Sequence, residues 1–202
     1  MLTTLGLMLF GYLVGAIPFS YLVARTQGID LRTVGSGNTG ASNVWRALGF
    51  RFFVVALIGD ILKGWLPTFV AYSVFERTPT ATIAVGVCAM LGHVFPVLMR
   101  FRGGKAVATS GGVMLGFAPV LTITAAIVWA IVYKVSGYPS VASLVDAVVI
   151  ALVGTAMGMF GALAAPFVAF LWLVVVVVFY LHRANIGRLM RGQEHGIGNR
   201  RA

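Results

Sequence analysis

Three short runs of glycine and polar residues hold the side chains of this chain that are best suited to chemistry. They lie at 35–43, 101–109 and 182–188. Each run combines glycines, whose backbone N–H groups can turn toward a ligand, with a cation inside the run or just beyond it. Phosphate oxygens bind to this combination of amides and cations. The sequence therefore predicts phosphate binding at these three places.

The first run is the richest in glycine. Glycine recurs there at every second or third position, so the backbone can curl into a nest of N–H donors. Asn43 and Arg46 follow at a spacing that puts both on one face of the next helix, where the Arg46 guanidinium suits phosphate oxygens. A flexible loop would also explain the glycines taken alone. The residues predicted to bind phosphate or substrate here are Gly35, Ser36, Gly37, Asn38, Gly40, Asn43 and Arg46.

The second run contains the turn Gly103, Gly104 and Lys105 and ends at Thr109. Its order is like that of a phosphate loop, but the spacing differs from Gly-x-x-x-x-Gly-Lys-Ser/Thr, so it predicts no nucleotide site. His93 precedes the turn and is either a hydrogen-bonded core histidine or a site residue. Its nearness to the turn favours the site.

Two ionisable residues lie inside apolar sequence. Asp60 and Lys63 are one helical turn apart, where a lone charge costs about 2.5–3.5 kcal/mol in a membrane-spanning helix. We therefore expect them to pair, and Lys63 either serves only that pair or also lines a cavity. Ser143 caps the start of a later helix or contacts substrate, and Asp146 reinforces the same helix start.

Composition identifies a membrane protein. Of 202 residues, 59% are hydrophobic and 10% are charged, which excludes an ordinary soluble domain. The net charge of +10 is explained better by basic cytoplasmic loops than by nucleic acid, so we expect no nucleic-acid partner. Cys88 is the only cysteine, which excludes disulfides and a cysteine metal site. A helix that crosses a bilayer needs roughly 20 apolar residues. The apolar segments are 3–24, 52–75, 79–99, 110–133 and 143–182.

The predicted fold is an all-α integral membrane bundle. The last segment is too long for one span and divides near 160, which gives six crossings. Basic loops place the C-terminus in the cytoplasm and the uncharged N-terminus outside, which requires an odd number. A hairpin of two short helices broken at 116–119, where Pro119 interrupts the helix, would return Lys134 to the cytoplasmic side and repair the parity. This gives about seven helical segments, some short and lining a polar site. One kinked span over 110–133 is the alternative. We expect one membrane domain over 1–195 and a flexible cytoplasmic tail over 196–202.

The three runs resemble the three motifs of the bacterial acyl-phosphate:glycerol-3-phosphate acyltransferases, over nearly the whole chain. The first run is similar to Gly-Ser-Gly-Asn-Pro-Gly-Ala-Thr-Asn followed by arginine, with departures at Thr39 and Ser42. Residues 92–109 are similar to the second motif, except that Ala106 stands where glycine is usual. Residues 182–194 are similar to the third.

The resemblance implies a multi-pass enzyme of the bacterial inner membrane. It implies glycerol 3-phosphate as acceptor and a long-chain acyl phosphate, rather than acyl-CoA, as donor, with membrane lipids around the enzyme and no metal or organic cofactor. Neither the oligomeric state, for which a monomer suffices, nor the chain-length preference follows from it. The implied catalytic residues are Ser36, Arg46, Lys105, His182 and Asn185, and further substrate-binding residues are Lys63, His93, Gly103, Gly104, Thr109, Ser143 and Glu194.

An acyl phosphate is a mixed anhydride with a good leaving group. The site need only position the acceptor hydroxyl, stabilise the oxyanion and neutralise the departing charge, so a covalent acyl-enzyme is unnecessary. His93, His182 and the acceptor's own phosphate are the candidate bases, and we favour the phosphate. A transporter or channel for a small phosphate-bearing anion is the alternative function. A metal-dependent phosphatidyl transferase is excluded, because the aspartates are scattered along the chain.

Overall fold

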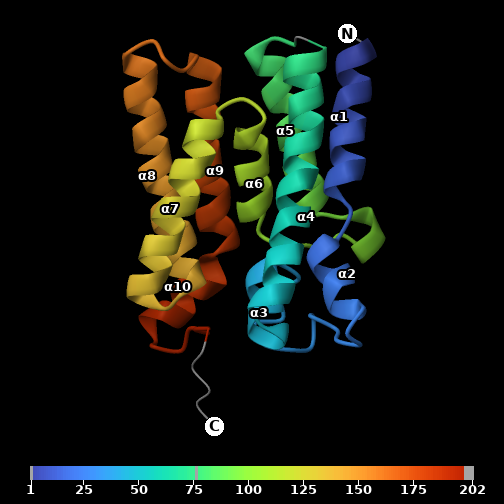
Figure 1. Ribbon diagram of the computed structural model, residues 1–202, viewed down its shortest axis with the longest axis vertical. Coiled ribbons are helices and arrows are strands. Elements are labelled where there is room, and N and C mark those ends of the chain that lie inside the picture. Colours follow the sequence, from blue (N-terminus) through green and yellow to red (C-terminus); the bar gives the residue numbers. More distant parts are fainter. Residues whose placement is uncertain (1, 76, 198–202) are drawn as a thin grey trace. The chain divides into compact units, whose positions relative to one another are not determined.

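The computed structural model describes residues 2–75 and 77–197, and these residues are helical without any strand (Figure 1). The all-α prediction is therefore confirmed. The α-helices are α1 (Leu2–Gly15), α2 (Phe19–Arg25), α3 (Ala41–Leu48), α4 (Phe50–Phe69), α5 (Pro79–Val94), α6 (Val107–Leu115), α7 (Pro119–Ser136), α8 (Pro139–Met159), α9 (Ala165–Leu181) and α10 (Arg183–Met190). A π-helical turn at Val70–Val74 extends α4, and a 3-10 turn lies at Val97–Met99.

Five helical stretches are long and apolar enough to cross a membrane. They are Leu2–Arg25, Phe50–Val74, Pro79–Met99, Pro119–Ser136 and Pro139–Met159. A sixth arises if α9 and α10, which meet at a bend of 58°, are counted as one broken span. Large apolar side chains remain exposed along these helices, as a lipid-facing surface requires. Which side of the membrane each terminus occupies stays a prediction.

The predicted breaks are present, and shorter helices add to them. The long last segment divides between Met159 and Ala165, as expected. The segment 110–133 is broken rather than one kinked helix, because α6 ends at Leu115 and α7 starts at Pro119. However, α7 by itself is long enough to be a span, so of these two helices only α6 is short. The described residues form ten α-helices rather than about seven, because α2, α3 and α10 add to the expected segments.

The helices group into two compact units, the first ending at Pro119 and the second beginning at Val120. The single domain over 1–195 stays a prediction. Of the predicted flexible tail, residues 198–202 lie outside the described part of the chain, as does Glu76 in the turn before α5.

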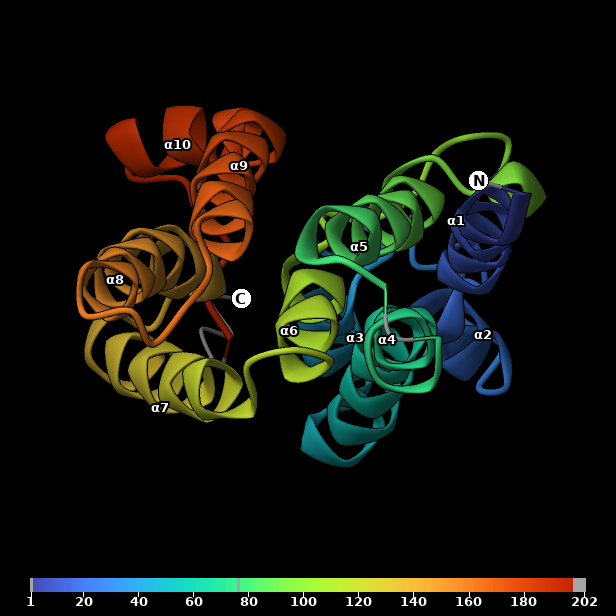
Figure 2. The ribbon, with the colours of Figure 1, turned by 90° about the horizontal axis from the view of Figure 1, so that it is seen from above.

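Glycines bring the helices of the first unit into close contact, with α1, α4 and α5 side by side and α6 against α4 (Figure 2). A Cβ on Gly15 would come within 2.1 Å of the Ala89 carbonyl oxygen, and one on Gly92 within 2.2 Å of that of Tyr12. The backbones of α1 and α5 therefore touch, as membrane helices do where small residues face each other. Gly64 brings α4 equally close to the backbone of α6.

The second unit is built on the pair α8 and α9. Gly154 of α8 lies against Leu171 of α9, and a Cβ there would come within 2.1 Å of the leucine side chain. The indole of Trp172 donates a 3.0 Å hydrogen bond to Thr155, which fixes the register of this pair. Trp129 of α7 donates to Ser143 of α8 at 3.1 Å, so α7 is tied to the same unit.

Candidate functional site

Asn43 shapes the first run from within. Its side chain is 1% exposed, and its oxygen accepts a 3.0 Å hydrogen bond from the backbone N–H of Ser36. Its amide nitrogen donates to the carbonyl oxygens of Leu31 at 3.1 Å and Val34 at 3.0 Å. Both amide hydrogens thus hold the run in shape, and direct contact between Asn43 and substrate stays a prediction.

The glycines of this run are needed for its backbone path. Gly35 and Gly37 have φ of 57° and 68°, which side chains rarely tolerate. A Cβ on Gly35 would also come within 2.3 Å of the Asn43 oxygen. The Asn38 side chain closes the next turn by accepting a 2.9 Å bond from the Gly40 N–H. Ser36 and Arg46 stay partly exposed at this end of the unit.

The turn of the second run folds back on the end of α5. The N–H of Gly103 donates to the Val94 carbonyl oxygen at 3.0 Å, and that of Gly104 to the His93 carbonyl oxygen at 3.1 Å. A Cβ on Gly103 would come within 1.9 Å of the His93 carbonyl oxygen. One on Gly104 would come within 2.2 Å of the imidazole Nε2. Only glycine fits at either position, which leaves Lys105 at the exit of a tightly held turn.

Backbone strain is concentrated around this turn. Within the described chain, the non-glycine residues with positive φ are Arg100, Phe101 and Ala106, at 52°, 61° and 59°. Left-handed conformation at such residues persists only where the surrounding structure imposes it, and it gathers at functional sites. Ala106 is 1% exposed and precedes the first residue of α6. The glycine usual at this place in the motif is therefore explained by its φ, and Ala106 adopts the same path at a cost.

A buried ion cluster lies next to the turn. Asp60 forms a 2.8 Å ion pair with Lys63 and accepts a 2.6 Å hydrogen bond from the Ser20 hydroxyl. The Lys63 ammonium also donates to the Ile17 carbonyl oxygen at 2.9 Å, at the break between α1 and α2. Nδ1 of His93 lies 3.8 Å from the Asp60 carboxylate. The predicted pairing of Asp60 with Lys63 is thus present.

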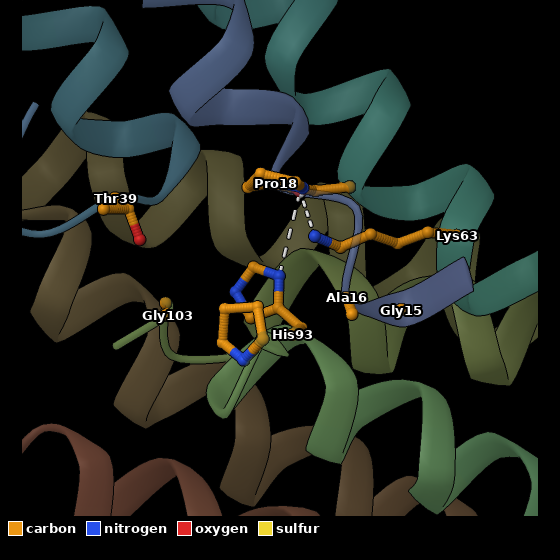
Figure 3. Close-up of a pocket in the computed structure, with 10 residues that line it drawn as sticks. Gly15, Ala16, Pro18, Thr39, Lys63, His93 and Gly103 are labelled. Atoms are coloured by element: carbon orange, nitrogen blue, oxygen red, sulfur yellow. Dashed lines mark ion pairs between the residues drawn. The ribbon is translucent and has the colours of Figure 1, made fainter. Parts of the chain in front are cut away.

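The first two runs and this cluster meet at one small pocket. Thr39 comes from the first run, Gly103 and Gly104 from the second, and the Lys63 and His93 side chains point into the pocket (Figure 3). The pocket has a volume of about 10 Å³, near the least that holds one water molecule. A phosphate group does not fit in a space of this size, so phosphate binding by the two runs stays a prediction. Thr109 is fully buried in α6, on the side of α4.

The third run belongs to the second unit, where Glu194 binds two of its side chains. The Glu194 carboxylate, 1% exposed, accepts hydrogen bonds from Ser140 at 2.9 Å, Asn185 at 2.5 Å and Arg188 at 2.9 Å. Burial raises the pKa of this carboxyl, but the three hydrogen bonds and the Arg188 charge outweigh burial and lower the pKa overall. Glu194 thus joins α10 to the start of α8.

Two further predicted site residues of the second unit have internal partners. Nδ1 of His182 lies 2.8 Å from the Val178 carbonyl oxygen, which places a proton on Nδ1. The Ser143 hydroxyl donates to the Pro139 carbonyl oxygen at 2.8 Å while it accepts the bond from Trp129. The helix-cap interpretation of Ser143 is replaced by a bond within α8, and its contact with substrate stays a prediction.

Comparison with known proteins decides the family. A family model described as glycerol-3-phosphate acyltransferase matches residues 5–192. The chain belongs to this family. It is 44% identical to the glycerol-3-phosphate acyltransferase of Roseiflexus sp. (strain RS-1), with 96% of this chain and 95% of that protein aligned. It is 37% identical to that of Aquifex aeolicus (strain VF5), over 94% of this chain and 96% of that protein.

Solved structures agree with the family. The fold matches the glycerol 3-phosphate form of PlsY (YgiH), an integral membrane glycerol 3-phosphate acyltransferase, with a TM-score of 0.88 and 35% identity. That match covers 97% of this chain and 96% of the other. The lysophosphatidic acid form of PlsY matches with a TM-score of 0.86 and 33% identity. The multi-helix membrane fold expected from the resemblance is therefore confirmed.

Sequence reasoning missed part of the cluster under the pocket. Ser20 and the carbonyl of Ile17 contribute to it, and both flank a break that divides the first apolar segment at Pro18. That proline was the available signal. Among the described residues no three His, Cys, Asp or Glu side chains gather as a metal site would require, and the absence of any cofactor stays a prediction.

Proposed function

We propose that this protein transfers an acyl group from a long-chain acyl phosphate to a hydroxyl of glycerol 3-phosphate. The products are lysophosphatidic acid and inorganic phosphate, and the setting is the inner membrane of a bacterium. Family membership supports the acceptor, because relatives across the full length carry that name. The donor and the inner-membrane location are implied by the resemblance, and the phosphate-suited runs and the apolar helices agree with them.

One observation carries the proposal. The glycine-rich backbone of the first run and the turn of the second meet at one pocket, with Arg46 three residues beyond the first run and Lys105 directly after the turn. Amides held in fixed turns beside cations suit the phosphate groups that both substrates carry. Exposed apolar side chains next to the turn, at Phe95, Leu98 and Phe101, provide surface for an acyl chain in the lipid.

The reaction needs few protein groups. The oxygen of the acceptor hydroxyl attacks the carbonyl carbon of the mixed anhydride and forms a tetrahedral oxyanion. The bond from that carbon to the phosphate oxygen then breaks, and inorganic phosphate leaves with the bonding pair. The hydroxyl proton passes to the acceptor's own phosphate, so no covalent acyl-enzyme and no protein base is required.

Each predicted residue has a proposed part in this reaction. The backbone of the first run, with Ser36, Asn38 and Arg46, binds one phosphate, while Asn43 holds the run in shape. Lys105 and the Gly103–Gly104 turn bind the phosphate of the acceptor and stabilise the developing oxyanion. His93 supports that turn, Lys63 lines the pocket beside it, and Thr109 is buried in α6. In the second unit, His182 and Asn185 orient substrate, Ser143 contacts it, and Glu194 holds Asn185.

Transport of a phosphate-bearing anion is the competing function. It would require an anion path open to both faces. The family is named for acyl transfer, which favours the enzyme.

The decisive experiment supplies purified protein in lipid with acyl phosphate and glycerol 3-phosphate and measures lysophosphatidic acid. We expect product from acyl phosphate and none from acyl-CoA. Product from acyl-CoA alone would overturn the donor. Lys105→Met should lower turnover about a hundredfold or more, as loss of an oxyanion-stabilising group does. Lys134→Met, which removes an exposed lysine of α7, is the matched control and should keep full activity.

A further inference from the structure

Asp60 lies where three helices meet, beside the pocket. Its carboxylate contacts Ser20 of α2 at 2.6 Å and Lys63, one turn along α4, at 2.8 Å. It also faces Nδ1 of His93 in α5 at 3.8 Å. All four side chains are at most 7% exposed. The Ser20 hydroxyl satisfies the second carboxylate oxygen, as a buried ion pair requires, whereas neutralising Lys63 does not need His93.

His93 connects this junction to the turn of the second run. Its carbonyl oxygen accepts the N–H of Gly104, and its imidazole lies so close to Gly104 that no Cβ fits between them. The imidazole therefore packs directly against Gly104, so a change in the orientation of the ring disturbs the turn. Lys105 is the next residue in the chain.

The facing groups fix the orientation of that ring. A carboxylate opposite Nδ1 favours a proton on this nitrogen, which leaves Nε2, an acceptor in the neutral ring, on the side of Gly104. Nδ1 is buried and has no hydrogen-bond partner among the described residues. The separation of 3.8 Å exceeds a hydrogen bond, and the pocket that both residues line has space for about one water molecule.

We propose that Asp60 is a positioning residue for acyl transfer, which orients His93, directly or through one water, and thereby fixes the Gly103–Gly104 turn that presents Lys105. The inference rests on the proposed function and deepens it. Asp60 touches no substrate. It acts through the imidazole and the turn, so its loss changes the binding of the phosphate-bearing acceptor.

The first test is Asp60→Asn in the full chain, purified in lipid. We expect the KM for glycerol 3-phosphate to rise about tenfold or more, since small displacements of positioning groups have effects of this size. Thr68→Val is the matched control: it removes a buried hydroxyl from the same helix that bonds only within α4, to Gly64 at 2.9 Å. That variant should keep the wild-type KM. A wild-type KM in Asp60→Asn would overturn the proposal.

A double variant separates positioning from charge neutralisation. Asp60→Asn leaves Lys63 buried without its counter-charge, which destabilises the fold. Asp60→Asn with Lys63→Met removes both charges, so the unfolding temperature should recover from that of the single variant while the KM stays raised. Recovery of both quantities would mean that Asp60 only neutralises Lys63, and the proposal would fail. If the single variant does not fold, the double variant is compared with Lys63→Met, and equal KM values in these two would overturn the proposal.

Calorimetric titration with glycerol 3-phosphate tests the positioning role of Asp60 separately from the proposed acyl transfer. If the wild-type protein forms no lysophosphatidic acid, acyl transfer fails as the function. The titration then still compares the dissociation constants of wild type and Asp60→Asn. An unchanged dissociation constant would overturn the positioning of the phosphate site by Asp60, whereas weaker binding by about tenfold or more supports it.

Discussion

The backbone N–H of Gly104 donates a 3.1 Å hydrogen bond to the carbonyl oxygen of His93, and a Cβ on Gly104 would come within 2.2 Å of the imidazole of the same histidine. The turn that presents Lys105 is therefore in direct contact with the end of α5. Neither partner can move alone, because the histidine is buried and the turn has no space behind it.

Gly104→Ala should displace this turn. We expect the KM for glycerol 3-phosphate to rise about tenfold or more, because the added methyl group must push the Gly104 backbone or the imidazole aside. Steady-state kinetics with varied acceptor measure this. Gly111→Ala in α6 is the control, because its Cβ meets nothing within 4 Å. An unchanged KM in Gly104→Ala would contradict a tightly held turn.

Ala106→Gly should stabilise the protein. Ala106 has a φ of 59°, and left-handed conformation costs a residue with a Cβ about 1–2 kcal/mol. The greater freedom of glycine in the unfolded chain offsets about 0.5–1 kcal/mol of this gain. Thermal unfolding in detergent should therefore show a small rise. Ala108→Gly, at an ordinary helical position of α6, should lower the unfolding temperature instead.

Glu194 should make stability depend on acid pH. The pKa of its carboxyl in the folded protein lies below the ordinary value of 4.5, so the unfolded chain takes up a proton first as the pH falls. Its contribution to the free energy of unfolding is complete above about pH 5 and is lost as the pH falls through the folded pKa. Unfolding temperatures measured across this range should therefore fall as the pH falls.

Glu194→Gln tests the same carboxylate at neutral pH. The variant keeps an oxygen for Ser140 and Asn185 but loses the charge that faces Arg188. We expect a loss of about 1.5–3 kcal/mol in the free energy of unfolding, as for other hydrogen bonds to charged groups. The acid dependence should shrink in parallel. A variant as stable and as acid-sensitive as wild type would exclude this role.

Asn43→Ala should loosen the first run. It leaves the carbonyls of Leu31 and Val34 and the N–H of Ser36 without their partner, at about 1–3 kcal/mol for each group that stays buried. Asn38→Ala, which removes a single bond to Gly40, is the milder comparison. Unfolding temperature and acceptor KM should both change more in Asn43→Ala. Equal effects would mean that Asn43 does not organise the run.

The substrate-assisted route predicts that no histidine is indispensable. His93→Ala and His182→Ala should each retain turnover within about a thousandfold of wild type, provided that folding and acceptor binding are intact. Single-turnover measurements in lipid distinguish slow chemistry from weak binding. A larger loss in either variant, with binding unchanged, would identify that histidine as the base.

Hydropathy predicted the membrane bundle because the length of an apolar segment is a local property that a bilayer of fixed thickness selects. The breaks at 116–119 and near 160 were predictable because proline and glycine weaken a helix locally, although Pro67 lies within α4. The short helices α2, α3 and α10 were not, because they depend on contacts with neighbouring helices rather than on composition.

The sequence by itself determined the class of protein and the family and predicted the residues that bind phosphate, because residue types and their spacing carry that information. Only the tertiary structure decided that Asn43 turns inward to hold its own run, that Asp60 joins Ser20, Lys63 and His93, and that Ala106 adopts a left-handed backbone. These features depend on atoms brought together from distant parts of the chain. Burial then decides between a side chain that binds substrate and one that holds the site in place.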